Sequence, residues 1–386
     1  MKDNTKNAAR VIAFYLPQFH PVPINDKYWG KGFTEWTNVV KAKPLYKGHY
    51  QPQIPADLGF YDLRLPEIRK DQADMAREYG IEGFCYWHYW FGEGKTVLDM
   101  PIKEVLRTGE PDFPFCLGWA NHSWSNRTWQ KNKLYEQNVI FFEQKYLGEK
   151  DYTDYFYSVL PLFKDKRYIK VNGKPLFLIY APQDIPDTEV FISTWRRLAQ
   201  ENDLSGIHFV ARVSAIGGLG RNVSKKQILS ETADRYNFFL SKGYDAICST
   251  SLTRADLCTG SRISKMFKLF LEKIGVSAIP DIHDYKKTIN YLYTEEDKWE
   301  NVYPQLVPRW DKTPRMGKGA HLYKNSTPAL FGKSIDIALD HIKNKDDEHK
   351  ILFVFAWNEW GEGAYLEPDL KFGRGYLEEL SKRILK

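Results

Sequence analysis

Eight short runs of apolar, β-prone residues recur along the chain, and they constrain its fold more than any other feature. The runs are Val11–Leu16, Ile81–Trp90, Pro114–Ala120, Pro175–Tyr180, Ile207–Val213, Tyr244–Ser249, Pro304–Trp310 and Ile351–Trp357. Most are apolar almost throughout, which is typical of parallel strands that are buried on both faces. The runs therefore predict a parallel sheet that is covered on both sides.

Amphipathic helical segments lie between several of these runs. Their apolar stripes are Leu65, Ile68, Met75, Ala76 and Tyr79, then Phe191, Trp195, Leu198 and Ala199, and finally Phe331, Ile335, Ala338, Leu339 and Ile342. Gly80 is suited to end the first helix and Asp187 to cap the second. Strands that alternate with helices indicate βαβ units. Eight of them predict a closed (β/α)8 TIM barrel, with an open doubly wound sheet as the alternative.

The length of 386 residues suits one barrel with long loops. We predict a flexible N-terminus, residues 1–10, and a single (β/α)8 catalytic domain, residues 11–386. Two insertions, at about 17–63 and 250–299, follow the first and sixth strands, so they emerge where barrels place their active sites. The second contains an amphipathic basic segment at Met266–Ile274, and Tyr376–Leu385 is expected to form a closing helix.

Composition narrows the class of ligand. The 12 Trp and 24 Tyr exceed what a core needs, and such rings often line concave sites that bind sugars, although an aromatic-rich core explains them equally well. The net charge of +6 is spread along the chain without a basic block, so it does not favour nucleic-acid binding.

The cysteines and the apolar segments exclude other classes. Cys85, Cys116, Cys248 and Cys258 have no CxxC spacing, so neither a zinc site nor a disulfide framework is predicted. No stretch of about 18 apolar residues spans a membrane. The polar N-terminus lacks a hydrophobic signal region, which leads us to expect a cytoplasmic location, with a trimmed periplasmic form as the alternative.

The segment after the eighth strand carries the strongest chemical signal. Glu359 and Glu362 follow a buried run, and Gly361 and Gly363 permit a tight turn that points both carboxyls into one cavity. Two carboxylates across one bond are the equipment of glycoside chemistry, in which one donates a proton and the other acts as nucleophile or base. Burial against neighbouring Trp residues is expected to raise one carboxyl pKa. A generic ExxE more often caps a helix, and no nearby His completes a metal site.

Several motifs resemble known carbohydrate-active families. The segment Asn358–Gly363 with Glu367 and Pro368 is similar to the signature of the endo-α-mannosidases and endo-mannanases of glycoside hydrolase family 99. The opening resembles the related WbsX-like proteins of bacterial polysaccharide clusters, through Ala13–His20, Trp29–Asn38, Gln51–Pro52, Asp57–Tyr61, Gly83–Trp90 and Asn121–Trp124. The resemblance extends from about Val11 to Asp369.

The resemblance implies a (β/α)8 barrel and retaining chemistry at an α-mannoside-like linkage. By position, Glu359 would deprotonate the 2-hydroxyl of the sugar to form an anhydro-sugar. Glu362 would protonate the leaving group and then activate the incoming nucleophile. Gly361 stands where the hydrolases usually have His, so contacts near the leaving group are expected to differ. The WbsX-like relatives are often described as glycosyltransferases, which leaves the direction of reaction open.

Further residues at strand ends are candidates for substrate binding. They are Tyr15, Gln18 and His20 after the first strand, Glu35 and Trp36 in the first insertion, Trp87 and Tyr89 in the second strand, Trp119, Asn121 and His122 at the third, Arg212 in the fifth, Trp310 at the seventh, and Trp357, Asn358 and Trp360 at the eighth. An inward, buried Arg212 would need an anionic partner, for which an active-site glutamate is the candidate. For His20, His122 and similar residues, a purely structural role is the competing interpretation.

Three functions remain in competition. The first is a retaining glycoside hydrolase, without cofactor or metal, that acts on an α-mannoside-like or rhamnose-containing oligosaccharide or polysaccharide. The second is a WbsX-type glycosyltransferase in lipopolysaccharide O-antigen or capsular polysaccharide synthesis, although the sequence has no Gly-rich pyrophosphate loop or convincing DxD motif. The third is a non-catalytic glycan-binding barrel, which has no need of two glutamates. Oligomeric state is not predicted.

Overall fold

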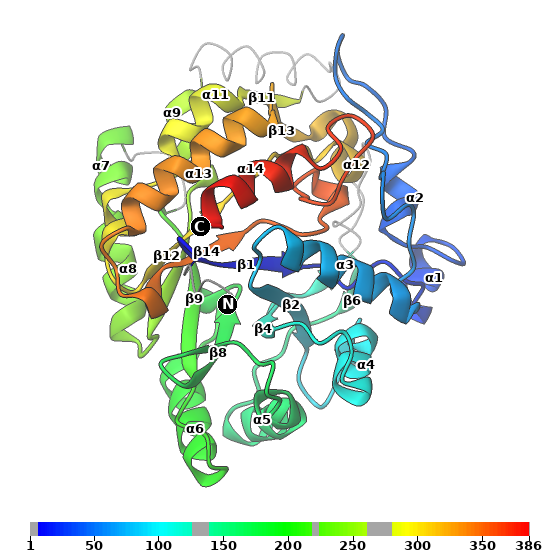
Figure 1. Ribbon diagram of the computed structural model, residues 1–386. Helices are drawn as coiled ribbons and strands as arrows, with labels where there is room; N and C mark the ends of the chain where they lie inside the picture. The colour runs from blue at the N-terminus through cyan, green and yellow to red at the C-terminus, as the bar shows by residue number, and fades with distance from the viewer. Residues whose placement is uncertain (1–6, 126–138, 218–223, 261–279, 386) are drawn as a thin grey trace, which may run out of the picture.

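Eight parallel strands close into a barrel in the computed structural model, which describes residues 7–125, 139–217, 224–260 and 280–385 (Figure 1). The strands are β1 (Arg10–Tyr15), β2 (Gly83–Trp90), β4 (Phe115–Trp119), β8 (Lys174–Ile179), β9 (His208–Ser214), β10 (Ala246–Thr250), β12 (Val302–Leu306) and β14 (Ile351–Val354). They pair in the order β1-β14-β12-β10-β9-β8-β4-β2, and β2 pairs with β1 to close the ring. The predicted (β/α)8 barrel is confirmed, and the open sheet is excluded.

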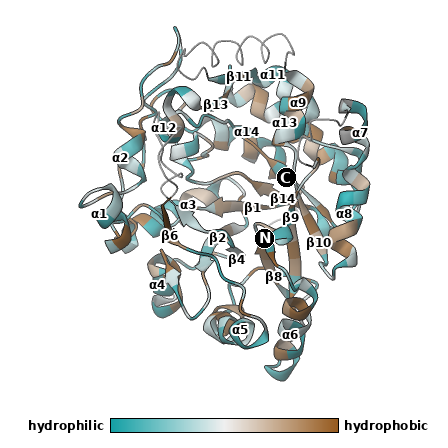
Figure 2. Cartoon of the chain, turned by 180° about the vertical axis from the view of Figure 1, so that it is seen from behind, coloured by the Kyte–Doolittle hydropathy of each residue, from teal (hydrophilic) through white to brown (hydrophobic). Residues whose placement is uncertain are grey.

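The strands are apolar throughout because both of their faces are covered. Every residue of β2, β4, β10, β12 and β14 is buried. In Figure 2 the central strands are coloured hydrophobic, whereas the outer helices show hydrophilic outward faces. Side chains alternate between the barrel interior and the helix layer along each strand, so both sets need apolar character.

The outer layer consists of amphipathic helices. The larger ones are α3 (Pro66–Glu78), α4 (Met100–Thr108), α5 (Glu149–Phe163), α6 (Thr188–Glu201), α8 (Thr232–Ser241), α13 (Pro328–Ile342) and α14 (Gly375–Ile384). The three predicted stripes lie on α3, α6 and α13, and the predicted closing helix is α14, which packs beside α13 (Figure 1). Asp187 stands at the N-cap of α6, but its carboxylate accepts a hydrogen bond from the Tyr152 hydroxyl and none from the helix backbone.

Shorter elements decorate the ends of the barrel. They are α1 (Pro23–Trp29), α2 (Glu35–Val39), β3 (Thr96–Val97), β5 (Trp124–Ser125), β6 (Ile140–Phe142), β7 (Lys170–Val171), α7 (Lys225–Ser230), α9 (Leu252–Thr259), β11 (Asp281–Asp284), α11 (Tyr285–Thr288), α12 (Thr313–Met316), β13 (His321–Lys324) and the 3₁₀ turns η2 (Pro182–Asp184), η3 (Ile289–Tyr291), η4 (Glu295–Lys298), η5 (Gly317–Gly319), η6 (Asp347–His349) and η7 (Trp360–Glu362). The helices α2, α12 and the turn η7 contact one another, so loops after three different strands meet at one mouth of the barrel.

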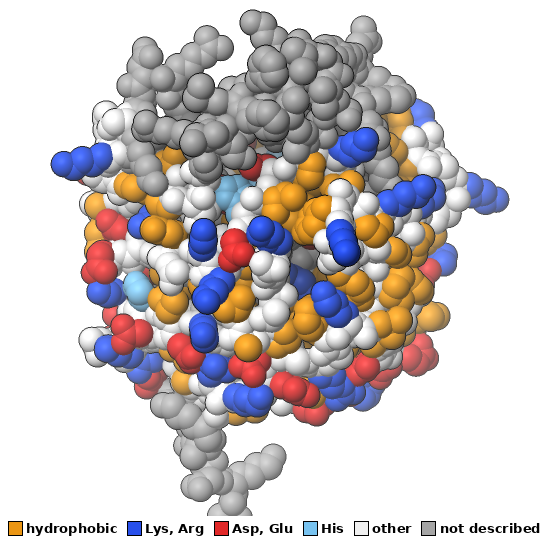
Figure 3. Space-filling model, turned by 90° about the horizontal axis from the view of Figure 1, so that it is seen from above, with side chains coloured by type: hydrophobic (Ala, Val, Ile, Leu, Met, Phe, Trp, Pro, Cys, Tyr) orange, Lys and Arg blue, Asp and Glu red, His pale blue; other side chains and the backbone are white. Residues whose placement is uncertain are grey.

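Several other expectations can be compared with the structure. Cys85, Cys116 and Cys248 are buried free thiols, and the side chain of Cys258 is partly exposed. The segment Met266–Ile274 lies outside the described residues. On the face seen in Figure 3, Lys and Arg side chains are dispersed among acidic and hydrophobic ones. Within the described ranges, no helix has both the length and the apolar character needed to cross a membrane.

We expect Gly83→Ala to destabilise the barrel. A Cβ at this position in β2 would lie 2.7 Å from the carbonyl carbon of Pro114, which is backbone and cannot rotate away. Overpacking of this kind costs about 1–3 kcal/mol of the free energy of unfolding. Gly319→Ala is the matched control, since a Cβ there meets nothing within 4 Å, and we expect it to change stability by less than about 0.5 kcal/mol. Urea unfolding of both variants tests this, and equal stabilities would contradict it.

Candidate active site

The carboxylates of the eighth strand are delivered by a short loop that is locked to the barrel. The loop follows β14 and includes the turn η7. Asn358 fixes it, because its amide accepts a hydrogen bond from the Leu16 backbone N–H at 2.8 Å and donates one to the Leu16 carbonyl at 3.0 Å. Gly363 has a φ of +55° and an added Cβ would lie 2.8 Å from the Asp311 Cβ, so glycine is required there. The ends of β1 and β14 are thereby joined beneath the two glutamates.

Three carboxyl groups, two of them buried and the third, that of Glu362, 12% exposed, converge on one arginine. Arg315, on α12, donates from Nη1 to Glu362 Oε1 at 2.6 Å and from Nη2 to Glu359 Oε2 and Glu35 Oε1, both at 3.0 Å. Lys312 Nζ lies 3.4 Å from Glu362 Oε1. Glu35 belongs to α2, so the site joins loops after the first, seventh and eighth barrel strands. The predicted convergence of Glu359 and Glu362 is present, and Glu35 lies beside them.

The pKa values of the three carboxyls diverge because their surroundings differ. The pKa of Glu359 is raised to about 8. Burial is the largest cause, the charge of Arg315 opposes it, and the charges of Glu362 and Glu35 add to the increase. Burial likewise raises the pKa of Glu35 to about 7, again opposed by Arg315. Burial also acts on Glu362, but Lys312 and Arg315 outweigh it and hold its pKa below the ordinary value. Near neutral pH Glu359 is therefore protonated and Glu362 ionised.

A cavity of about 210 Å³ opens above these groups. Its lining comprises Leu16, Gln18, Trp87, Tyr89, Ala120, His122, Trp124, Tyr180, Arg315, Phe355, Glu359 and Glu362. Both catalytic candidates thus face one pocket with aromatic walls, of the kind that encloses a sugar ring. Of the predicted substrate-binding residues, Gln18, Trp87, Tyr89 and His122 line this cavity.

Strand alternation explains which aromatic residues of β2 face the cavity. Trp87 and Tyr89 point inward, whereas His88 bonds Tyr155 in the helix layer through Nδ1 at 2.9 Å. The Trp87 ring lies over Gly118 of β4, where an added Cβ would lie 2.9 Å from it.

Burial, together with the charges of Arg212 and Arg315, lowers the pKa of His122 to about 4. His122 is therefore neutral at physiological pH.

Four predicted binding residues form a supporting layer behind the cavity. The Tyr15 hydroxyl donates to Gln72 Oε1 at 2.6 Å, and Gln72 donates to Glu367 Oε1 at 2.7 Å. Trp360 donates to Glu367 Oε2 at 2.6 Å and stacks on Tyr365. Trp357 is fully buried against Phe84, and Asn358 is the clamp on Leu16 described above. The interpretation of Trp357 and Trp360 as cavity walls is therefore corrected, because both rings face the core.

Other predicted binding residues also lie away from the cavity lining. Trp119 donates to the Trp90 carbonyl, and Trp36 donates to the Tyr61 carbonyl. Asn121 bonds the backbone N–H and carbonyl of Ala181, so its amide is occupied structurally. His20 is buried, and this burial lowers its pKa.

The expected partner of Arg212 requires a correction. Its guanidinium lies 4.8 Å from the ring centroid of Tyr180 and 5.8 Å from that of Phe355, as a cation over aromatic faces. The glutamates are paired with Arg315 instead. Sequence reasoning missed Arg315, Lys312, Tyr180 and Phe355. Three carboxyls that are buried or nearly buried do require a cation, but the sequence does not show which arginine the fold brings to them.

Trp310 faces a second, larger cavity of about 580 Å³. Its lining includes Tyr46, Tyr50, Trp310, Asp311 and Gly363. Asp311 and Gly363 adjoin the catalytic loop, because the Asp311 backbone N–H donates to the Glu362 carbonyl at 2.7 Å. Both cavities therefore border the loop that carries Glu362.

Comparison with known proteins gives the family of the chain and agrees with its fold. The profile of the family described as "Glycosyltransferase WbsX" matches residues 11–380. The chain belongs to the WbsX glycosyltransferase family. It is 32% identical over 371 residues to the uncharacterized protein WxcX of Xanthomonas campestris pv. campestris strain B100, covering 96% of this chain and 49% of WxcX. The chain spans about half the length of the curated relatives it matches.

Solved structures share the barrel of this WbsX family member. A GH99 endo-alpha-mannosidase from Bacteroides thetaiotaomicron has a TM-score of 0.53 at 15% identity, with 98% of this chain and 97% of that chain covered. A glycoside hydrolase-like protein has a TM-score of 0.59 at 12% identity, covering 99% and 95%. These likenesses show the fold. The family is described as one of glycosyltransferases, which is a carbohydrate-active class.

We expect Arg315→Gln to destabilise the WbsX-family chain in a pH-dependent way. Without the guanidinium, Glu35, Glu359 and Glu362 take up protons at pH 5 but must ionise without a partner at pH 8.5. Removing one partner of a buried ion pair costs about 3–5 kcal/mol, so we expect that loss at pH 8.5 and a smaller one at pH 5.

Urea unfolding at both pH values tests this. Arg107→Gln is the control, since Arg107 is 69% exposed in a surface pair with Glu104, and we expect it to change stability by less than about 0.5 kcal/mol at either pH. A destabilisation of Arg315→Gln that is equal at both pH values would refute the assignment.

Proposed function

We propose that this chain catalyses retaining glycoside chemistry as a hydrolase, on an α-mannoside-like or rhamnose-containing glycan, with Glu359 and Glu362 as its acid–base pair. The observation that carries the proposal is that both carboxyls face one aromatic-walled cavity with their pKa values displaced in opposite directions. Glycoside cleavage needs one carboxyl that holds a proton and another that is ionised. Resemblance to the family 99 signature supports the α-mannoside-like linkage.

The distribution of the proton between the glutamates depends on what occupies the cavity. In the empty cavity Glu359 has the higher pKa, whereas the resemblance assigns proton donation to Glu362 and removal of the 2-hydroxyl proton to Glu359. Lys312 is the partner of Glu362 that can move more easily. Its side chain is 33% exposed, and its Nζ lies 3.4 Å from Glu362 Oε1, compared with 2.6 Å for Nη1 of Arg315. We propose that a bound sugar displaces Lys312, which raises the pKa of Glu362 and transfers the proton to it.

The cavity walls suit a single sugar ring with hydroxyl contacts. Trp87, Tyr89 and Trp124 supply aromatic faces for the C–H bonds of the ring. Gln18 and neutral His122 supply hydrogen-bonding groups that do not compete with the carboxylates for charge. The larger cavity beside Trp310 would receive the neighbouring part of the glycan.

A transferase is the second candidate, favoured by the description of the family. A retaining barrel can transfer a sugar to an acceptor hydroxyl when that hydroxyl outcompetes water. The same two glutamates would serve, so the difference lies in donor and acceptor rather than in the catalytic pair.

We expect Glu359→Gln and Glu362→Gln each to lower kcat/KM on a glycan substrate by about 10²–10⁴-fold, the range of a lost general acid or base. An activated aryl glycoside, such as a dinitrophenyl mannoside, needs little protonation of its leaving group. If Glu362 is the acid, Glu362→Gln retains activity on this substrate while Glu359→Gln does not. Glu201→Gln, on the exposed surface of α6, is the control and should match the wild type. Unchanged turnover in both cavity variants would eliminate the pair.

We expect a bell-shaped pH dependence of kcat/KM. Activity falls as pH rises through about 8, because Glu359 then loses the proton that the two glutamates share. It falls again at acid pH, below the ordinary carboxyl range, because Glu362 becomes protonated. Since the charge of Glu35 helps to raise the pKa of Glu359, Glu35→Gln should shift the basic limb to lower pH. A basic limb that stays in place in this variant would contradict the coupling.

Calorimetric titration separates hydrolase from transferase. We expect no saturable binding of GDP-mannose or dTDP-rhamnose to the full chain, because a glycan rather than a nucleotide fills the two cavities. Saturable binding of either donor, with product formed only when an acceptor sugar is present, would replace the hydrolase proposal by the transferase.

A further inference from the structure

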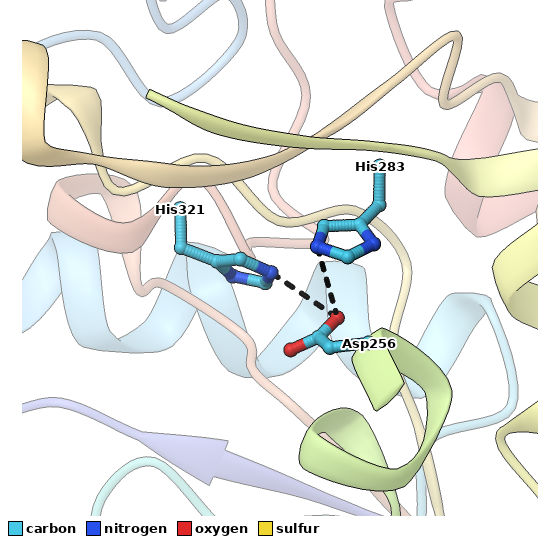
Figure 4. Close-up of side chains that lie close together, drawn as sticks. All are labelled: Asp256, His283 and His321. Carbon is cyan, nitrogen blue, oxygen red and sulfur yellow. Dashed lines mark ion pairs between the residues drawn. The ribbon is translucent and has the colours of Figure 1, made fainter. Parts of the chain in front are cut away.

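Two histidines and one aspartate converge outside the catalytic cavity. They are Asp256 on α9, His283 on β11 and His321 on β13, and their ligand atoms all lie within 4.8 Å of one another (Figure 4). His321 Nε2 lies 3.1 Å from Asp256 Oδ1, and His283 Nε2 lies 4.0 Å from the same oxygen. The strands β11 and β13 pair in parallel, with Asp281 opposite His321. The loops after β10 and β12 thus meet at this cluster.

The tautomer of His283 is fixed by a chain of hydrogen bonds. Thr259 donates its hydroxyl proton to the Ala255 carbonyl at 2.8 Å. Its oxygen is therefore left to accept from His283 Nδ1–H, which is 2.8 Å away. With Nδ1 carrying the proton, Nε2 of neutral His283 presents a lone pair to the cluster. Second-layer bonds of this kind orient the histidines that bind metals.

The lone pair of His283 points toward negative charge. Nε2 is 4.0 Å from Asp256 Oδ1 and 3.4 Å from Asp281 Oδ1, yet it is buried and makes no hydrogen bond among the described residues. His283 as a whole is only 5% exposed. His321 Nε2 is likewise buried without a hydrogen bond, despite its short distance to Asp256. Electron-rich atoms gathered in this way, without aligned N–H···O bonds, call for a cation between them rather than for a proton on one nitrogen.

We propose that Asp256, His283 and His321 bind a zinc ion. Two imidazole nitrogens and one carboxylate suit Zn²⁺, whereas Mg²⁺ and Ca²⁺ prefer oxygen ligands alone. Tetrahedral zinc with bonds of about 2.0–2.1 Å needs donor atoms about 3.3–3.5 Å apart, so ligand atoms that lie up to 4.8 Å apart must approach one another by up to about 1.5 Å. Tyr323 holds the carboxylate in place by donating to Asp256 Oδ1 at 2.9 Å. Three protein ligands leave the fourth position to water or another ligand.

The ion would clamp two loops that border the active site. Trp310 connects the regions, because its ring centroid is 6.5 Å from that of His321 and 5.1 Å from that of Phe355, which lines the catalytic cavity. Zinc would therefore brace the loop from Trp310 to Arg315. No metal site was predicted from the cysteine spacing or from the surroundings of Glu359 and Glu362. These three ligands lie far apart in the sequence, between positions 256 and 321, so no local motif marks them. The proposal does not depend on which glycoside reaction the cavity catalyses.

Metal analysis of the full chain tests the site. We expect the chelator-treated, dialysed protein to bind one Zn²⁺ per chain in calorimetry, with a raised Tm, and to show no such binding of Mg²⁺. Co²⁺ in place of zinc should give the visible absorption of a tetrahedral site. Since binding requires neutral imidazoles, affinity should weaken as pH falls. The proposal would be overturned if calorimetry, Tm and the Co²⁺ spectrum all showed no metal binding.

Variants locate the ion. His321→Gln, at a side chain that is 23% exposed, should abolish stoichiometric binding without unfolding the chain, and Asp256→Asn should do the same. Thr259→Val removes only the support of His283 and should weaken binding about 10–100-fold, as losses of second-layer bonds do. His341→Gln is the control, because that histidine bonds its own helix at the Ile337 carbonyl. Zinc binding that is unchanged in His321→Gln, or lost equally in His341→Gln, would identify an adventitious ion only.

Discussion

Three carboxyl groups that are buried or nearly buried share one guanidinium, and the rest of the candidate site depends on this interaction. A buried carboxylate is costly unless it is paired or protonated, and Arg315 cannot satisfy three full negative charges. The excess of negative charge is relieved because the pKa values of the three carboxyls differ. Glu362 stays ionised beside Lys312 and Arg315, whereas burial raises the pKa of Glu359 to about 8 and that of Glu35 to about 7. An acid and a base thus arise from chemically identical side chains, because their neighbours differ.

The barrel holds the loops that carry these residues in fixed positions. Glu35, Arg315 and the two catalytic candidates come from loops after three strands, and each loop is fixed by separate contacts. Asn358 ties the eighth strand to the first, and Glu367 binds Tyr61, Gln72 and Trp360 beneath the cavity. Several predicted sugar contacts are in fact members of this layer. Their polar atoms hold the loops in place, so of the predicted binding residues only Gln18, Trp87, Tyr89 and His122 line the cavity.

Membership in the WbsX family and a barrel shared with a GH99 endo-alpha-mannosidase are compatible with one another. Hydrolysis and transfer by a retaining mechanism use the same pair of carboxyls and differ in what attacks the sugar. The decision between them therefore rests on the surroundings of the pair, where Gly361 has no side chain and the family 99 hydrolases that the sequence resembles usually have His. The proposed zinc cluster borders the same region through Trp310, and it would brace the loop that carries Arg315.

The sequence by itself determined the barrel, because eight apolar runs alternating with amphipathic helices leave few other ways to cover a sheet on both faces. It also determined that Glu359 and Glu362 share a cavity, since two flanking glycines after a buried strand confine them to one turn. Only the tertiary structure decided the cation, the walls and the supporting layer. Arg315 rather than Arg212 meets the glutamates, Trp357 and Trp360 face the core, and Asp256 meets His283 and His321. These outcomes depend on which loops pack together at the barrel mouth, and that long-range packing leaves no local pattern in the chain.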